Sequence, residues 1–402
     1  MQTTFYTDAA QSFTSGEASL QTLEQELATG NAVPNAGVNP AAFIGAAADA
    51  NDISQLNAED GNQTSVQDTL GLGTSALDEA STVLDQVQQI ALEAINGTVD
   101  GSEYQALSEQ VQQNLQQLLA VANTAGNNGN YVFAGTAANT KPFVQTAGGS
   151  VNYMGDDGLS SVEVSPGITI NAALSGAPFL GGFSGDGYAS VTAASANTGA
   201  ATFLPVGVLN AASASAFQRA SAPITVSFST TASGKETYLA TQGSATLGSG
   251  SAQPGQDITL DGIQFGLSGT PSAGDSFTVS PARPQSVFDL VQTIQNALAS
   301  PGTTAAQRAQ TTQVLGNALS GITQYQGLFT SANARIGVVL QTVSNAGTAN
   351  AQRSTSDQTD AANLTSANTP DVLTAIDEQT TALQAALQAF GMTEGLSVFN
   401  YL

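Results

Sequence analysis

The chain contains no cysteine, histidine or tryptophan among its 402 residues. Without cysteine there is no disulfide framework and no thiolate nucleophile. Without histidine there is no imidazole base and no imidazole ligand for a metal. Serine and threonine are abundant, but nothing in the sequence activates their hydroxyl groups. These absences disfavour an enzyme, and we expect neither catalytic residues nor a cofactor.

Positively charged residues are also scarce. The chain has 7 basic and 31 acidic residues, so its net charge is −24. So few cations cannot neutralise a nucleic-acid backbone or bind an anionic lipid surface. We therefore expect no nucleic-acid partner and no membrane partner.

Long apolar runs are also missing, so no segment is suited to span a bilayer. The N-terminal stretch MQTTFYTDAAQSF lacks the basic and apolar regions of a secretory signal peptide. Composition therefore predicts a cytosolic protein or one exported without a cleaved signal. The length of 402 residues allows two or more domains with their own cores.

What the chain does have is an apolar stripe at helical spacing near each end. Neither 1–42 nor 365–402 contains a lysine or arginine, so salt bridges between the two ends are impossible. Helices of this kind are marginal alone. We therefore predict terminal helices over 1–40 and 365–402 that form subunit contacts through Phe13, Leu20, Leu23, Leu27, Val372, Ile376, Leu383, Leu387, Phe390, Phe399, Tyr401 and Leu402.

A second apolar pattern predicts a helical rod over 41–143 and 284–364. Ile322, Phe329, Ile336 and Val343 are seven residues apart, which is the spacing of a coiled-coil seam. The seam is expected to turn polar and weaken from Asn350 onwards. Glycines at 61, 71 and 73 are expected to make the first long helix irregular. Together with the four seam residues, the predicted rod core comprises Leu84, Val87, Leu107, Val111 and Leu118.

The middle of the chain, 144–283, is rich in Gly, Ser and Thr and alternates as strands do. An Asp261-Gly262 turn between two apolar strands predicts a hairpin, and a short strand is expected at Tyr131–Gly135. The predicted fold is mainly α with a β insertion: the N- and C-terminal segments form a long α-helical coiled-coil rod that carries an inserted β-rich middle domain.

Several acidic and glycine-rich stretches offer alternatives. Asp156-Asp157 and the aspartates at 257, 261 and 275 could supply oxygen ligands for Ca²⁺, but no twelve-residue calcium loop is present and turns explain them. The Gly181–Gly187 segment lacks the lysine of a phosphate loop. The paired carboxylates Asp377 and Glu378 are expected to face solvent on a helix with no cleft around them, which argues against the acid–base pair of a glycosidase. We expect no metal site.

Four motifs, in order along the chain, resemble flagellins and their relatives. They are LQTLEQELATG at Leu20–Gly30, NYVFAGTAANTKPF at Asn130–Phe143, GTPSAGDSFTVSP at Gly269–Pro281 and LSVFNYL at Leu396–Leu402. Together they are more similar to the hook–filament junction (FlgL) type than to filament flagellin. Unlike that family, this chain has no charged residue in 31–40.

The resemblance implies a structural protein of the bacterial flagellum, exported unfolded by the flagellar type III apparatus without a cleaved signal and located outside the cell. It implies self-association into a ring, with a hook-side hook-associated protein, filament flagellin and an export chaperone as partners. Filament flagellin is the alternative within this class. From another class, the alternative is a secreted β-rich adhesin or glycan-binding module on helical stalks.

Overall fold

The computed structural model describes residues 2–96, 100–220 and 222–395, which fall into two compact units. The terminal unit contains the chain up to Asn62, the short piece Val164–Pro166 and the chain from Asn345. The central unit contains Gln63–Glu163 and Gly167–Ser344. Helices α2 (Pro40–Ile95) and α7 (Ala305–Thr365) contribute residues to both units. The fold is mainly helical with an inserted β-rich region, as predicted.

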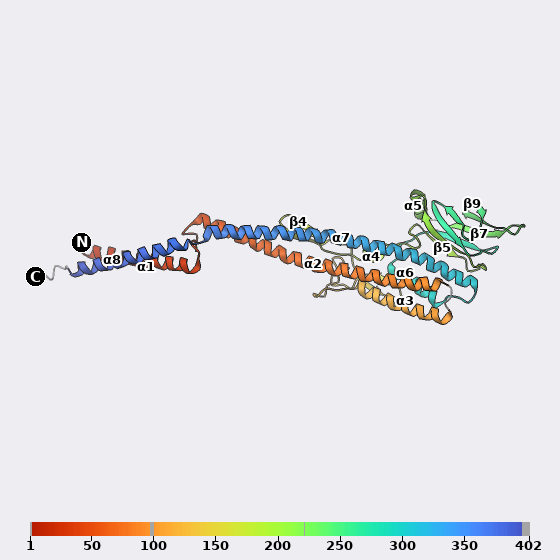
Figure 1. Ribbon diagram of the computed structural model, residues 1–402, viewed down its shortest axis with the longest axis horizontal. Coiled ribbons are helices and arrows are strands. Elements are labelled where there is room, and N and C mark those ends of the chain that lie inside the picture. The colour runs from red at the N-terminus through yellow and green to blue at the C-terminus, as the bar shows by residue number, and fades with distance from the viewer. Residues whose placement is uncertain (1, 97–99, 221, 396–402) are drawn as a thin grey trace. The chain divides into compact units, whose positions relative to one another are not determined.

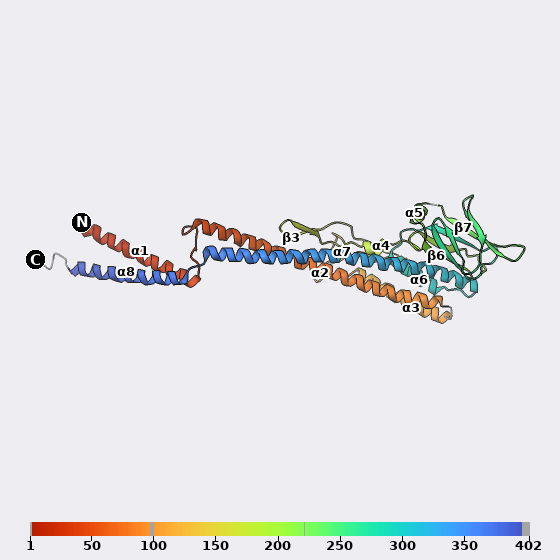
Figure 2. The same cartoon turned by 45° about the horizontal axis from the view of Figure 1, so that its top comes forward.

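In the terminal unit, α1 (Gln2–Thr29) and α8 (Thr369–Gly395) pack side by side (Figures 1 and 2). Helix α1 ends at Thr29 and is followed by Gly30, whose φ of +68° suits glycine. The backbone beyond α1 is tied to the α7–α8 junction: the Ala32 amide donates to the Thr365 carbonyl at 2.7 Å, and the Ala367 amide to the Gly30 carbonyl at 2.9 Å. These bonds join the two terminal segments without any charged group.

In the central unit, α3 (Gly101–Ala122) packs against α6 (Val287–Ala299). Asp100 caps α3 in a capping box with Glu103, so the helix begins at Gly101. Several hydrogen bonds from Ser102 and Glu103 hold the pKa of the Asp100 carboxyl below its usual value. Ser286 caps α6, accepting from the Asp289 amide at 3.1 Å.

The irregularity predicted in α2 is wrong, since the helix runs without a break from Pro40 to Ile95. A glycine inside a helix costs about 1 kcal/mol relative to alanine, and the buried stripe of α2 outweighs that cost. At Gly73 a side chain would not fit, because a Cβ there would lie 2.4 Å from Leu174 Cδ1. This glycine admits a close approach of another segment.

Between α3 and α6 lies the β-rich region, whose strands pair antiparallel wherever the register is known. The strands are β1 (Phe143–Gln145), β2 (Val151–Tyr153), β3 (Ser161–Ser165), β4 (Ile168–Asn171), β5 (Ala189–Ala193), β6 (Thr202–Val208), β7 (Ile224–Thr230), β8 (Glu236–Gln242), β9 (Ala245–Ser251), β10 (Asp257–Leu260), β11 (Ile263–Ser268) and β12 (Ser276–Pro281). A five-stranded sheet has the order β5-β12-β7-β8-β9, and a three-stranded sheet has the order β10-β11-β6. The pairs β1–β2 and β3–β4 are separate.

The hairpin predicted at Asp261-Gly262 is confirmed as β10–β11, with φ of 48° and 79° at these two residues. The strand predicted at Tyr131–Gly135 is wrong: Tyr131 forms an isolated bridge with Ala125, and turns follow. Two short helices in this region were not predicted, α4 (Ala177–Leu180) and α5 (Ala211–Arg219).

Phenylalanine rings from the two larger sheets pack against one another. The rings of Phe203 and Phe265 stack at 5.0 Å, and Phe277 contacts both Phe203 at 5.9 Å and Phe228 at 5.8 Å. All four side chains are buried. The β-rich region therefore has a hydrophobic core of its own.

A row of amide side chains on α7 attaches these sheets to the helix. Gln313 pairs with the Phe203 backbone, accepting at 2.7 Å and donating at 2.8 Å. Asn317 donates to the Val191 carbonyl at 2.6 Å, and Gln310 to the Ala194 carbonyl at 3.1 Å. Residues spaced by three and four share one helix face, so one face of α7 satisfies backbone groups of β5 and β6.

Candidate assembly interface

The contact between α1 and α8 is apolar and closely packed at Gly16. The Phe13 and Phe390 rings meet edge to face at 5.9 Å. A Cβ at Gly16 would lie 3.0 Å from Leu383 Cδ1, and Gln379 donates to the Gly16 carbonyl at 3.3 Å. The pair is therefore held by ring packing, a close approach at glycine and a neutral hydrogen bond.

The terminal residues singled out from the sequence divide into three groups. Phe13, Leu20, Leu23, Leu27, Ile376, Leu383 and Phe390 are half-buried, and Val372 is buried. Leu387 is 54% exposed. Phe399, Tyr401 and Leu402 lie outside the described residues. The α1–α8 contact thus covers part of each apolar stripe and leaves Leu387 uncovered.

Sequence reasoning missed other exposed apolar side chains of the terminal unit. Leu373 is 48% exposed and lies two heptads before Leu387, a spacing that could have revealed it. Val38 and Ile44 are 55% and 67% exposed. They lie in a stretch without any charged residue, between Glu26 and Asp49. Exposed apolar groups in uncharged surroundings are typical of protein contacts.

The predicted rod-core residues lie inside the protein. Leu84, Val87, Leu107, Val111, Leu118, Ile322, Phe329, Ile336 and Val343 are all buried. Phe329 also belongs to an aromatic cluster that sequence reasoning missed. Its ring lies 5.2 Å from Phe179, which contacts Phe133 at 5.1 Å and Phe143 at 5.5 Å. The cluster collects rings from segments far apart in the sequence, and no local spacing signals that.

Tyr325 closes this aromatic cluster on one side. Its hydroxyl donates to the Gln285 carbonyl and accepts from the Gly182 amide, the latter at 3.1 Å. Burial raises the pKa of Tyr325 well above its ordinary value of 10.0, outweighing the Gly182 hydrogen bond. Gly182 is required here, because a Cβ would overlap the tyrosine ring.

Carboxylates pair with amides along α2 and α7, where salt bridges would be usual. In the central unit, Asn333 donates to Asp78 and Gln326 to Asp85, both at 2.6 Å. Amides are neutral donors, so the pairing needs none of the scarce cations. The helices are held by apolar packing and neutral donors.

Carboxylates also pair with amides in the terminal unit, where the apolar seam was predicted to turn polar and weaken. Asn350 is only 5% exposed and donates to the buried Glu59 at 3.1 Å. It also accepts from the Ser165 hydroxyl at 2.7 Å. The seam turns polar but stays buried here. Two ion pairs of Arg353 follow, with Asp52 at 2.9 Å and with Asp357 at 3.8 Å.

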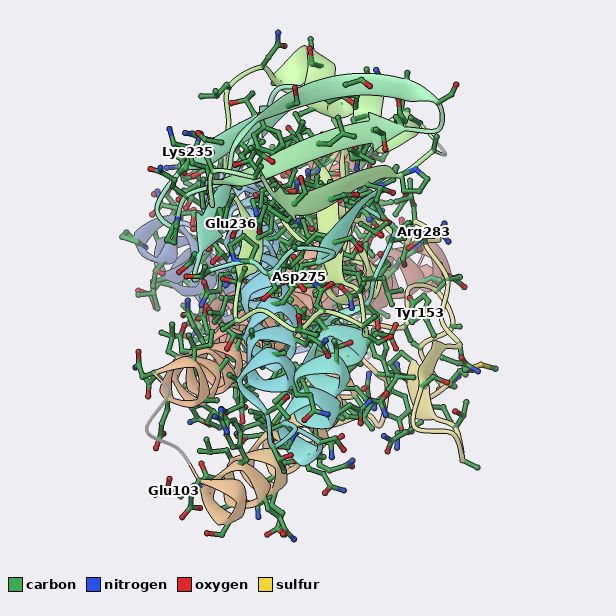
Figure 3. All side chains as sticks on the ribbon, turned by 90° about the vertical axis from the view of Figure 1, so that its right-hand side faces the viewer. Glu103, Tyr153, Lys235, Glu236, Asp275 and Arg283 are labelled. Carbon is green, nitrogen blue, oxygen red and sulfur yellow. The ribbon has the colours of Figure 1, made fainter. Side chains whose placement is uncertain are left out.

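The aspartates weighed as cation ligands form local hydrogen bonds instead. Asp275, inside the β-rich region in Figure 3, accepts from the amides of Thr198 and Ser272, both at 2.8 Å. Asp156 accepts from the amide and hydroxyl of Thr136 at 2.8 and 2.7 Å and from the Gly158 amide at 2.8 Å. These bonds hold the pKa of the Asp156 carboxyl below its usual value. Within the described ranges no three acidic side chains converge on a metal position.

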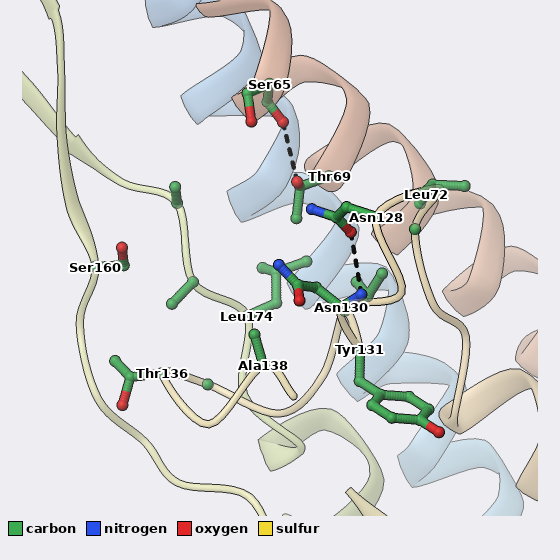
Figure 4. Close-up of a pocket in the computed structure, with 15 residues that line it drawn as sticks. Ser65, Thr69, Leu72, Asn128, Asn130, Tyr131, Thr136, Ala138, Ser160 and Leu174 are labelled. Atoms are coloured by element: carbon green, nitrogen blue, oxygen red, sulfur yellow. Dashed lines mark hydrogen bonds between the residues drawn. The ribbon is translucent and has the colours of Figure 1, made fainter. Parts of the chain in front are cut away.

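The cleft shown in Figure 4 has a volume of about 250 Å³ and is lined by a mixture of small polar and apolar side chains. Thr69 donates to the Ser65 carbonyl at 2.9 Å, and Asn128 accepts from the Asn130 amide at 3.0 Å. Tyr131 is the sole titratable group among the lining residues, so the cleft offers no acid–base pair. None of the helices described is long and apolar enough to cross a membrane.

Comparison with known proteins shows which proteins this chain resembles. The model of the bacterial flagellin N-terminal helical region matches residues 3–138. Flagellar hook-associated protein 3 of Escherichia coli (strain K12) is 29% identical over 162 residues, which are 39% of this chain and 48% of that protein. The match therefore spans about half the length of this curated relative.

Solved structures extend the likeness. The crystal structure of flagellar hook associated protein-3 from Legionella pneumophila has a TM-score of 0.71 and 25% identity, over 77% of this chain and 96% of that one. A crystal structure of the flagellar junction protein FlgL from the same organism has a TM-score of 0.67 and 25% identity, over 73% and 97% of the two chains. The similarity thus runs through nearly the whole of both solved chains.

Proposed function

We propose that this chain, which belongs to the flagellin-like proteins of the hook-associated FlgL type, is a structural adaptor that joins the flagellar hook to the filament. The observation that carries this proposal is the likeness to hook-associated protein 3 over 96% of that solved chain. The curated relative has the same name. These relatives favour a junction protein over a filament flagellin.

The adaptor works mechanically, without catalysis. Copies of the chain associate into a ring through their terminal helices, where Leu387 and Leu373 remain exposed. Each copy has a net charge of −24, so copies repel one another wherever their acidic surfaces meet. The uncharged stretch around Val38 and Ile44 and the base-free terminal helices are the surfaces on which apolar contact faces least repulsion.

The proposal assigns a position to each part of the chain. Residues 1–40 and 365–402 form the inner layer, 41–143 and 284–364 form the rod, and 144–283 project outward. The hook-side hook-associated protein and filament flagellin bind at the two faces of the ring.

We also propose a route of export. The chain passes unfolded through the flagellar type III apparatus, assisted by an export chaperone, and reaches the flagellum outside the cell. The absence of cysteine means that no disulfide locks the chain before passage. Isolated terminal helices of this composition are marginal in water, which suits a chain that is threaded unfolded.

Deletion of the gene tests the function. The expected result under electron microscopy is hooks without filaments, with flagellin released into the medium. Restoring the gene should return filaments to the hooks. A strain that lacks the chain yet builds attached filaments contradicts the proposal, and normal motility together with ligand binding by this chain would favour the adhesin alternative.

A further inference from the structure

The structure points to a second contact between copies, made by the central unit, and we propose that the loop at 154–159 of one copy docks into a groove beside Arg335 of the next. This proposal rests on the proposed ring and deepens it, because it names the surfaces that set neighbouring copies side by side. Both surfaces belong to the central unit.

The loop is a rigid projection that exposes apolar side chains. Asp156 fixes it through the three hydrogen bonds to Thr136 and Gly158, and the Asp156 amide donates to the Ala134 carbonyl at 3.1 Å. Leu159 is nevertheless 75% exposed and Met154 is 56% exposed. A loop already ordered in the free chain loses little conformational entropy on binding, so it is suited to insert into a partner.

The groove has the complementary character. It has a volume of about 460 Å³ and lies between the segment around Leu174 and helix α7, with Leu328, Ile336 and Val339 among its lining residues. Arg335 is the one charged residue that lines it. The groove therefore suits an apolar side chain accompanied by a carboxylate.

The two surfaces carry opposite charges, and neither charge is paired within the part of the chain that the structure describes. Among the residues that the structure describes, the exposed Arg335 side chain forms no hydrogen bond or ion pair. The exposed Asp157 carboxylate, next to the fixed Asp156, likewise has no hydrogen bond or ion pair within the described ranges. The chain has only 7 basic residues, and a cation in an apolar groove favours an acidic partner. Every copy carries such an acidic residue, Asp157, on this loop. We therefore take the occupant to be a second copy of this chain.

The loop and the groove lie on opposite sides of the segment 172–174. The Leu174 carbonyl accepts from the Gly135 amide, and the Ala172 amide donates to the Ser160 carbonyl, both at 2.9 Å. The loop side of the segment is thus occupied by 135 and 160, and the groove opens on its α7 side. Figure 4 shows Ser160 and Thr136 close together, with Leu174 nearer the helices. Different surfaces on the two partners make a head-to-tail contact, which closes into a ring when the rotation between copies permits.

Disulfide trapping tests the contact, and the chain has no cysteine to interfere. The double variant L159C/V339C, exported by cells and oxidised on intact flagella, should give a ladder of trimers and larger species on a non-reducing gel. L159C alone and V339C alone should remain monomeric. If the double variant is found at the junction but gives only monomers or dimers on the gel, the proposed contact is wrong.

Charge exchange provides the second arm, with L159C/V339C as background. D157R or R335D should lower the ladder yield on the order of tenfold, since each leaves like charges facing in the contact, and the pair D157R/R335D should restore it. D68R and R219D, at exposed positions elsewhere, are matched controls that should leave the yield unchanged. Equal yields from all variants would overturn the proposal.

Failure of this contact and failure of the proposed function are distinguishable. A chain that reaches the junction without forming the ladder refutes the contact alone. A chain that is never found at the junction refutes the proposed function.

Discussion

The two compact units differ in how completely they bury their phenylalanine rings. In the central unit, Phe179, Phe203 and Phe329 are at most 1% exposed. In the terminal unit, Phe13 and Phe390 touch each other but stay half-buried, and Leu387 is 54% exposed. The central unit completes its aromatic core within a single chain, whereas the terminal unit leaves part of its apolar stripe exposed. In the proposed assembly, contacts between copies would gain most from covering this exposed stripe.

The largest expected effect comes from placing a charge on the incomplete surface. We expect Leu387→Asp to abolish assembly while leaving the free chain folded, because an exposed leucine contributes little to the chain's own core. The measurement is recovery of the variant from isolated flagella, with circular dichroism of the free chain. Leu209→Asp, at a leucine 67% exposed in the β-rich region, is the matched control and should assemble normally. Normal junctions built from Leu387→Asp chains would contradict this account.

Truncating one aromatic ring in each unit tests the comparison directly. Phe329→Ala should cost about 3–5 kcal/mol of unfolding free energy, because it leaves a cavity in a closed core. Phe390→Ala should cost the free chain only about 1 kcal/mol, because its site is half open. Chemical denaturation of both purified variants measures the two costs. Equal costs would show that the terminal helices are as fully packed as the central unit.

A polar variant separates the buried pairing of the terminal unit from the exposed pairing of the central unit. Asn350→Leu should cost about 1–3 kcal/mol, because buried Glu59 loses a hydrogen-bond donor. Gln326→Leu should cost no more than about 1 kcal/mol, because Asp85 remains exposed to water. Thermal unfolding of both variants measures the difference, and the reverse order would refute our view of the seam.

Tyr325→Phe is expected to cost about 1–3 kcal/mol at neutral pH, since two buried backbone groups lose their partner. Its pH dependence is the sharper result. The pKa of Tyr325 is raised in the folded chain, so its contribution is complete below pH 10.0 and is lost as the pH rises above that value. Wild-type stability should therefore fall more steeply above pH 10 than that of the variant. Parallel curves from unfolding at a series of alkaline pH values would contradict this assignment.

Local patterns made most of the helical architecture predictable. The seven-residue spacing from Ile322 to Val343 specified a long helix, and all four side chains are buried in it. The Asp-Gly turn specified the β10–β11 hairpin, because φ is positive at both positions. Where a pattern is repeated or its turn chemistry is restrictive, the sequence alone is sufficient.

What could not be predicted depends on contacts between distant segments. Tyr131–Gly135 has the composition of a strand, but only an isolated bridge pairs with it, so it forms turns. Gly73 was expected to make α2 irregular, but it is instead the position where the Leu174 side chain packs closely against the helix. The loop at Leu159 and the groove at Arg335 likewise emerge only when exposure is known.

Hydrogen exchange most directly tests the central claim of the proposed assembly, that the terminal helices complete their packing only between copies while the core of the central unit is complete in the single chain. Amides of α1 and α8 should exchange rapidly in the free full-length chain and become protected in isolated hook–filament assemblies. Amides of α7 between 305 and 344 should be protected in both states. Equal protection of α1 and α8 in the free and assembled chain would contradict the claim.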